Sequence, residues 1–258
     1  MSPVILKLVA IASAVLYYLS FGLFFVKKLK SAARFTWGAA FALNVSLVIN
    51  NWIVNGYVPF VSMYQVLTFL GMCFLPLFLY VHFMYKFDWM ANYFAFAAAI
   101  IMTGVSFMNA TSKWAFPPAL QSVWFVPHVL VYMFAYSLGT VAFFVAVLSF
   151  INKSPDKKSM LDNGAYVLSC MAFPFMTAGM MIGAVWANEV WGNFWSWDIK
   201  ENWALMTWLM FMLYLHFRRH KSTAKYSKLF VILGFMCIII TLFFVNIIGA
   251  GSRHAYSV

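Results

Sequence analysis

Segment 186–203 concentrates aromatic and charged side chains that suit the binding of a flat ligand. It reads W-A-N-E-V-W-G-N-F-W-S-W-D-I-K-E-N-W, and together with Trp208 it holds six of the eleven tryptophans of the chain. Tryptophans also form belts at the headgroup level of membranes, but a belt spreads its rings over many helix ends at both interfaces. Their concentration around Gly192, beside Asp198 and Glu201, favours a built surface for a flat aromatic ligand.

The same segment contains a helix start signal. Asp198 and Glu201 stand three residues apart just before an apolar run, which is the spacing of a capping box. We therefore expect Asp198 to begin the helix that follows. A cap of this kind would also fix the loop that presents the tryptophans.

Two histidines are expected at the same membrane level as this loop. His128 begins a long apolar run, and His254 lies in G-A-G-S-R-H-A-Y near the C-terminus. Two such imidazoles would supply both axial nitrogens of a haem iron. The alternative is that each is only a polar helix end, so the haem interpretation depends on their pairing beside the aromatic surface.

His82 and His216 lie near the opposite ends of two other apolar runs. An ionisable side chain inside a membrane span is a functional candidate, so these two could form a second ligand pair within the membrane. The alternative is that each reaches toward the interface beside its basic and aromatic neighbours. His220 lies in the basic loop R-R-H-K and is expected to be solvated.

The composition indicates that these residues belong to a membrane protein. Of the 258 residues, 65% are apolar and only 9% are charged, whereas soluble domains are about 25% charged. The composition excludes a soluble enzyme, a disordered chain and a disulfide scaffold. Cys73, Cys170 and Cys237 each lie within an apolar run without any C-x-x-C pair, so we expect buried hydrophobic side chains rather than a dithiol or a metal site.

Apolar runs of about 20 residues predict membrane-spanning helices. Polar residues separate eight such runs, at about 3–26, 36–54, 65–85, 90–108, 128–151, 164–186, 203–217 and 228–248. We expect an all-α integral membrane protein, a bundle of about eight helices forming one domain over residues 1–258. The first run has no small-x-small cleavage pattern after it and is expected to be a retained span. Segment 152–159, N-K-S-P-D-K-K-S, is expected to be a solvated inner connection.

Basic residues predict the orientation of the bundle. The loops after the first, third, fifth and seventh runs hold 13 of the Lys and Arg residues, and the other side holds four, namely Lys7, Lys113, Lys200 and Arg253. Because basic residues collect on the cytoplasmic side, both termini and the tryptophan segment are expected to face outward. The net charge of +11 then marks the inner face, and no nucleic-acid partner is expected.

Four segments resemble one family of membrane proteins. Segment Trp191–Glu201 resembles the WWD motif of the haem-handling proteins of cytochrome c maturation. Within that superfamily the chain is similar to the CcsA (ResC) family of the system II pathway, through P-P-A-L-Q-S-V-W-F-V-P-H-V at 117–129, N-G-Y-V-P-F-V-S-M-Y at 55–64 and G-A-G-S-R-H-A-Y at 249–256. The related CcmC family shares the tryptophan motif but has fewer spans and lacks P-A-L-Q-S.

The resemblance implies roles for residues that match the family pattern. It makes His128 and His254 the axial ligands of haem at the external site and His216 a membrane histidine that binds haem on its way outward. The porphyrin platform would be formed by Trp191, Trp195, Trp197 and Asp198. His82 as a further ligand is our own suggestion, because the family's partner histidine is ascribed to the CcsB subunit.

Two positions depart from the family pattern. Gln65 stands where many relatives carry an acid, and the C-terminal motif reads S-R-H-A-Y instead of L-H-S-Y. The second departure places Arg253 next to His254, where its guanidinium would suit a haem propionate. Lys200 and Lys113 are the other cations expected on that face away from the N-terminus.

The resemblance also implies a function, a ligand and partners. The chain would carry haem b outward, present it and attach it to apocytochrome c at a C-x-x-C-H segment, together with a CcsB (ResB) subunit. The membrane would be a bacterial inner membrane or, in a plastid, the thylakoid. No side chain stands out as an acid or base, so the chain is either part of a cytochrome c synthase or a haem-presenting transporter. One alternative is a subunit of a membrane electron-transfer complex that binds haem b between His82 and His216. The other is a small-molecule transporter.

Overall fold

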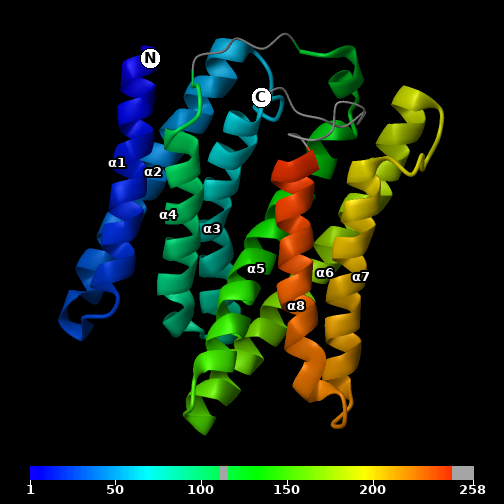
Figure 1. Ribbon diagram of the computed structural model, residues 1–258. Coiled ribbons are helices and arrows are strands. Elements are labelled where there is room, and N and C mark those ends of the chain that lie inside the picture. Colours follow the sequence, from blue (N-terminus) through cyan, green and yellow to red (C-terminus); the bar gives the residue numbers. More distant parts are fainter. Residues whose placement is uncertain (111–115, 246–258) are drawn as a thin grey trace. The chain divides into compact units, whose positions relative to one another are not determined.

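A computed structural model describes residues 1–110 and 116–245 of the chain. These residues form helices joined by loops, with no β-strand among them. The chain divides into two compact units, Met1–Pro117 and Pro118–Val258, which are described separately below (Figure 1). A single membrane domain stays a prediction.

Unit 1 is a bundle of four helices. They are α1 (Pro3–Leu23), α2 (Lys30–Asn55), α3 (Met63–Tyr85) and α4 (Ala91–Ser106), with the short 3-10 turns η1 (Lys27–Leu29) and η2 (Asp88–Met90). α1 packs against α2 and α4, and α3 packs against α4 and α2. Large side chains fill the interior, among them the fully buried Tyr17, Trp37, Phe74 and Phe94.

The first residues of α3 explain why glutamine is accepted at position 65. Ser62 caps this helix, and Gln65 completes the capping box. The Gln65 Oε1 atom accepts hydrogen bonds from the backbone N–H groups of Val61 at 2.9 Å and Ser62 at 3.3 Å. An amide oxygen serves this role as well as a carboxylate does, so this departure from the family pattern keeps the local structure.

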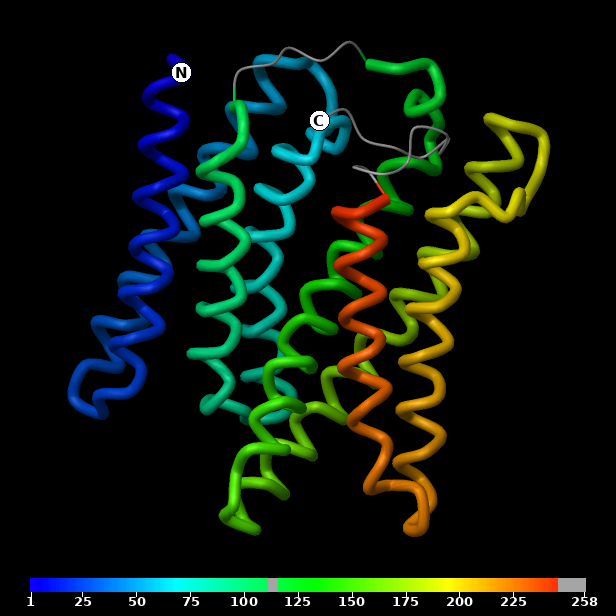
Figure 2. Tube along the Cα trace, viewed as in Figure 1, coloured from blue at the N-terminus to red at the C-terminus, as the bar shows by residue number. Residues whose placement is uncertain are grey.

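Unit 2 carries the site residues described below. It contains the 3-10 turn η3 (Pro118–Gln121), α5 (Phe125–Ile151), α6 (Pro155–Trp191), α7 (Ile199–Arg219) and α8 (Ala224–Ile239), which continues as the π-helical turn η4 (Ile240–Phe244). α5 packs along α6, α7 packs along α8, and α8 also contacts α5. In Figure 2 the loop between α6 and α7 lies at one end of the unit, and the turn between α7 and α8 lies at the other. We call these the tryptophan end and the basic end.

A buried ion pair joins three helices at the basic end. The Lys228 ammonium on α8 donates hydrogen bonds to Asp162 Oδ1 on α6 and to Ser149 Oγ on α5, each at 2.9 Å. Only 6% of Lys228 is exposed. The Ser149 hydroxyl also forms a hydrogen bond with Asp162. The ammonium, the hydroxyl and the carboxylate of these three residues therefore all have hydrogen-bond partners.

A helix lies at each of the eight predicted apolar runs as far as residue 245, and seven of the described helices are long and apolar enough to cross a membrane. The chain is therefore a multi-pass membrane protein. α7, the predicted seventh span, is helical but is not among these seven, so eight spans and outward termini stay predictions. The expected solvated connection at 152–159 is wrong in part, because α6 already begins at Pro155. Proline suits the first position of a helix, where its missing N–H costs no hydrogen bond.

Candidate functional site

His128 lies in the first turn of α5, at the tryptophan end of unit 2. Its Nδ1 atom is 2.9 Å from the backbone oxygen of Gly179 on α6. A carbonyl oxygen only accepts hydrogen bonds, so this contact requires the proton on Nδ1. In the neutral ring the lone pair is then on Nε2, the arrangement in which an imidazole binds a metal while its other nitrogen is held by the protein.

Two glycines of α6 make room for the side chains of α5. A Cβ atom added to Gly183 would lie 2.5 Å from Cε1 and 2.6 Å from Nδ1 of His128. A Cβ atom on Gly179 would lie 2.7 Å from the Tyr132 ring. Contacts this short require a rearrangement, so the position of the imidazole depends on glycine at 183.

Trp186 supports the other side of His128. Its ring centroid is 5.5 Å from that of His128 and 5.1 Å from that of Trp191. Only 3% of Trp186 is exposed, and its Nε1 donates a hydrogen bond of 2.9 Å to the backbone oxygen of Ala119. This hydrogen bond therefore ties the P-P-A-L-Q segment to the last turns of α6. The role of Trp186 in the site is to support the rings of His128 and Trp191.

The loop between α6 and α7 is held by side chains from the start of α7. α6 ends at Trp191, and the residue that caps it, Gly192, has a φ of +76°, which favours glycine. Asp198 caps α7 and Glu201 completes the capping box, which confirms the helix start predicted from D-x-x-E. Glu201 Oε2 also accepts from the Ser196 N–H at 2.8 Å, so one carboxylate fixes both Ser196 and Asp198.

Trp197 projects from this loop with an unusual backbone. Its φ is +59°, in the left-handed region that a bulky residue rarely adopts. Its side chain is 68% exposed, and its backbone oxygen accepts a hydrogen bond of 3.0 Å from Asn202 Nδ2. The rings of Trp195 and Trp197 lie 5.9 Å apart at 84°, so the loop presents two differently oriented faces.

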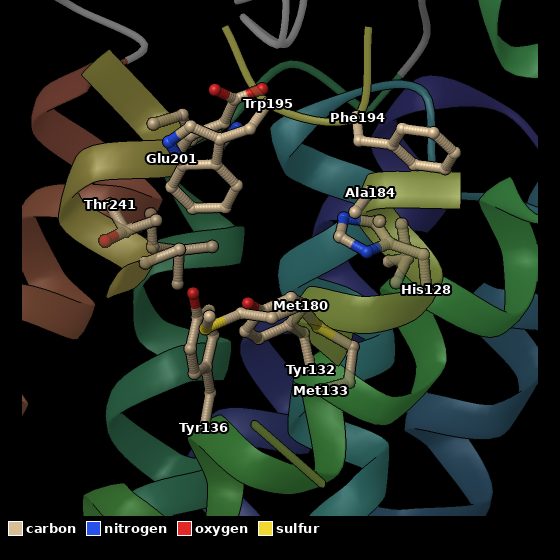
Figure 3. A pocket seen from close by; sticks show the side chains of 15 residues that line it. His128, Tyr132, Met133, Tyr136, Met180, Ala184, Phe194, Trp195, Glu201 and Thr241 are labelled. Carbon is tan, nitrogen blue, oxygen red and sulfur yellow. The ribbon is translucent and has the colours of Figure 1, made fainter. Parts of the chain in front are cut away.

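A pocket joins this loop to His128. About 710 Å³ of space lies within it, part of which is open to solvent, and its walls come from α5, α6, α7, η4 and the loop. In Figure 3, Trp195 and Glu201 lie on one side, His128, Ala184 and Phe194 lie on the other, and Tyr136 and Met180 lie below. An aromatic wall facing an imidazole is a suitable lining for a flat ligand with a metal at its centre.

Lys200 brings a cation to the same pocket. Withdrawal of its ammonium group from water lowers the pKa of Lys200 to about 7, although the Asp198 carboxylate raises it in part. An anionic group of a ligand would stabilise the charged form of Lys200. The pocket thus offers an imidazole, aromatic rings and a cation.

The structure brings only part of the predicted site together. His128 and Trp195 line the pocket, Trp191 contacts Trp186, and Trp197 and Asp198 belong to the adjoining loop. His254 and Arg253 lie outside the described residues. His216 is exposed near the basic end, with its ring 5.5 Å from that of His220.

His82 belongs to unit 1, near the end of α3. Its Nδ1 atom lies 2.6 Å from Asp88 Oδ1, within ion-pair distance, although the angle is not that of a hydrogen bond. His82 and His216 thus belong to different units, and their pairing as haem ligands stays a prediction.

The glycines that seat His128 were not among the predicted site residues. Gly179 and Gly183 form a G-x-x-x-G pattern, which in membrane helices marks close approach to a neighbouring helix. That pattern could have identified the face of α6 that meets α5. Tyr136 and Met180, which line the pocket, are by contrast indistinguishable from ordinary core residues in the sequence.

Comparisons with known proteins give the family. The sequence model described as "Cytochrome C assembly protein" matches residues 60–252. "Cytochrome c biogenesis protein CcsA" of Chlamydomonas reinhardtii is 34% identical over 253 residues, covering 90% of this chain and 70% of that protein. The protein of the same name from Guillardia theta is 31% identical over 293 residues, covering 96% and 93%.

A solved structure agrees in fold. "Cytochrome c Heme Lyase CcmF" superposes with a TM-score of 0.68 at 18% identity, covering 94% of this chain and 47% of that one, so this chain spans about half its length. At this identity the likeness concerns the fold alone. From the family model and the relatives, the chain belongs to the CcsA family of cytochrome c biogenesis proteins.

Proposed function

We propose that this protein acts in cytochrome c biogenesis by presenting haem b at the tryptophan end of unit 2 for covalent attachment to apocytochrome c. The observation that carries this proposal is the seating of His128 in a pocket with Trp195, where the Gly179 oxygen holds its Nδ1 at 2.9 Å. Membership of the CcsA family and the multi-pass architecture support the same function.

His128 would ligate the haem iron through Nε2. Its Nδ1 proton is engaged by a backbone oxygen, and such a partner fixes the orientation of a ligating ring and raises its basicity. The porphyrin would lie against a platform formed by Trp191, Trp195, Trp197 and Asp198. Of these, Trp195 lines the pocket, and the capping box of α7 holds the loop in place.

The second axial ligand would be His254, with Arg253 pairing a haem propionate. Leu242 of η4 lines the pocket, and only eleven residues separate it from His254. An extended chain spans at most about 3.6 Å per residue, so this separation is long enough to reach across the pocket. Lys200 would provide a further cation for a propionate.

The reaction requires positioning more than acid–base chemistry. Each thiol of a C-x-x-C-H segment would add across one haem vinyl group, with sulfur bonding one carbon and the thiol hydrogen ending on the other. No electrons are gained or lost in this addition. Holding the porphyrin beside a captured peptide makes the step effectively intramolecular. No residue is assigned as acid or base, so the chain would act as the haem-presenting part of a synthase.

The remaining expectations complete the proposal. The partner would be a CcsB-type subunit, and haem would arrive from the inner side by way of His216, with His82 as a further ligand. The tryptophan end would face the periplasm, or the lumen of a thylakoid. Both termini would lie on that side if all eight helices, α7 included, cross the membrane.

The test is covalent haem attachment in cells that produce the protein, a CcsB-type subunit and an apocytochrome c. We expect His128→Ala to abolish the haem-staining band of the cytochrome. His220→Ala, which changes an exposed histidine outside the pocket, should leave it unchanged. Equal haem attachment in the two variants would overturn the proposal. A tightly haem-loaded protein without any effect on cytochrome assembly would favour an electron-transfer subunit instead.

A further inference from the structure

A second hollow lies at the basic end of unit 2, away from the loop and from His128. It is an open groove between the start of α6, the end of α7 and the start of α8, and the space of about 1240 Å³ assigned to it includes open solvent. Its walls are Pro155, Lys158, Ser159, Met160, Asp162, Asn163, Arg218 and Ala224. None of these residues belongs to the proposed haem site.

The groove carries a net positive charge. Its only carboxylate, Asp162, is paired with the buried ammonium of Lys228 at 2.9 Å. Lys158 and Arg218 are the cations of the lining. The Arg218 guanidinium lies 4.8 Å from the centre of the Tyr166 ring, an interaction that orients it. Two cations therefore face the groove, and the carboxylate of its lining is already paired with Lys228.

The polar groups of the lining match a phosphate ester. Ser159 and Asn163 are four residues apart on α6, so they lie on one face of that helix. Their hydroxyl and amide groups are hydrogen-bond donors beside the two cations. A phosphodiester offers the complementary acceptor oxygens and a single negative charge.

We propose that this groove binds the headgroup of an anionic phospholipid. α6 and α8 are candidate membrane spans whose first turns border the groove, so the groove would lie near the lipid headgroups if both helices cross the membrane. Phe150, at the end of α5, is 51% exposed and lies beside Lys228, so an apolar surface for an acyl chain adjoins the charged lining. Basic pockets at the ends of membrane helices bind such lipids.

The experiment measures binding of single lipids to the purified full chain by native mass spectrometry. The probes are dioleoyl-phosphatidylglycerol, dioleoyl-phosphatidylcholine and inorganic phosphate. Each juxtamembrane Lys or Arg contributes about 1 kcal/mol to anionic lipid binding, so we expect about 30-fold weaker phosphatidylglycerol binding in Lys158→Gln/Arg218→Gln. Lys27→Gln/Lys28→Gln removes the same charge from exposed positions of unit 1, outside the lining, and should cost less than about 3-fold.

Stronger binding of phosphatidylglycerol than of phosphatidylcholine, lost in the groove variant and kept in the control, supports the site. Equal binding of the two lipids, or equal losses in the two double variants, would overturn it. Displacement of the lipid by millimolar phosphate would show a soluble-anion site instead. If the double variant does not fold, Lys158→Gln alone changes an exposed residue and should still weaken phosphatidylglycerol binding about 5-fold. Haem attachment is measured separately, so either proposal can fail alone.

Discussion

The proposed iron ligand depends on residues that have no polar side chain of their own. His128 is held by a backbone oxygen and occupies space that exists only because α6 has glycine at 183. A ligand constrained in this way is already oriented when haem arrives, which lowers the entropy lost on binding. Backbone geometry, not only the imidazole, therefore defines the site.

Gly183→Ala tests this dependence directly. The new Cβ would overlap Cε1 and Nδ1 of His128, so the ring must move and its bond to iron should be lost. We expect a changed Soret band in the purified protein and recovery of the original band on adding imidazole. Gly104→Ala is the control, because no atom lies within 4 Å of a Cβ at that helical position. An unchanged Soret band in Gly183→Ala would contradict the packing argument.

Trp197 adopts a conformation that its own side chain disfavours. A left-handed backbone costs an ordinary residue about 1–2 kcal/mol, and most of its ring is exposed, so little burial offsets that cost. Strain that persists at an exposed position is typical of functional residues. We interpret it as the consequence of presenting this ring.

Trp197→Gly should therefore separate stability from function. Glycine accepts a positive φ, so we expect the free energy of unfolding to stay equal or rise by up to about 1 kcal/mol. Haem retention should nevertheless fall, because the platform loses one ring. Met206→Gly, at an exposed position inside α7, should lose about 1 kcal/mol. A stability loss in Trp197→Gly as large as in Met206→Gly, with haem retention unchanged, would contradict this account.

At the scale of elements, the helices of unit 2 are joined differently at their two ends. At the tryptophan end, the capping box of α7 holds the loop that follows α6. At the same end, the hydrogen bond from Trp186 to Ala119 ties η3 to α6. At the basic end, the Lys228–Asp162 pair joins α5, α6 and α8 through buried polar contacts. The pocket beside His128 thus lies at the opposite end of unit 2 from the Lys228–Asp162 pair.

Removing Lys228 from the Lys228–Asp162 pair should lower the free energy of unfolding. Lys228→Met leaves the Asp162 carboxylate and Ser149 hydroxyl without their ammonium donor, and because the Asp162 side chain is 25% exposed, we expect a loss of about 1–3 kcal/mol. Thermal unfolding in detergent should show this loss, whereas Lys225→Met, at an exposed position of the same helix, should change stability by less than about 0.5 kcal/mol. Equal effects of the two substitutions would show that the pair does not stabilise unit 2.

Apolar runs predict the positions of α1 to α8, and D-x-x-E predicts the start of α7, because both are local signals. The apolar run predicts a start of α6 near residue 164, whereas the helix begins at Pro155, because its first turns are polar. For the site, the histidine and tryptophans could be selected by residue type. The glycines that make room for His128 could not be selected in this way. Their role depends on which face of α6 packs against α5, and a single sequence indicates such a tertiary contact only indirectly.

At the scale of the whole molecule, the chain is a multi-pass membrane protein whose basic residues gather in alternate loops. Segments 152–158 and 218–228 hold eight of the ten Lys and Arg residues of unit 2, whereas the loop between α6 and α7 has none. This asymmetry predicts that the tryptophan end faces outward. The predicted direction of haem movement follows from the same asymmetry.

The orientation can be checked with single cysteines in a variant lacking the three native ones. Asn193→Cys, in the loop after α6, should react with a membrane-impermeant maleimide in intact cells. Asp156→Cys, at the start of α6, should react only after the membrane is opened. Both positions are exposed, so the pair is matched for access, and the reverse labelling pattern would show that the tryptophan end faces inward.

The central claim is that His128 binds haem iron at the tryptophan end of unit 2. The most direct measurement is the absorption spectrum of the purified full chain, with haem content per protein, for the natural sequence, His128→Ala and His220→Ala. We predict that His128→Ala shifts the Soret band and lowers the haem content, that added imidazole reverses the shift, and that His220→Ala changes neither. A natural Soret band and full haem content in His128→Ala would contradict the account.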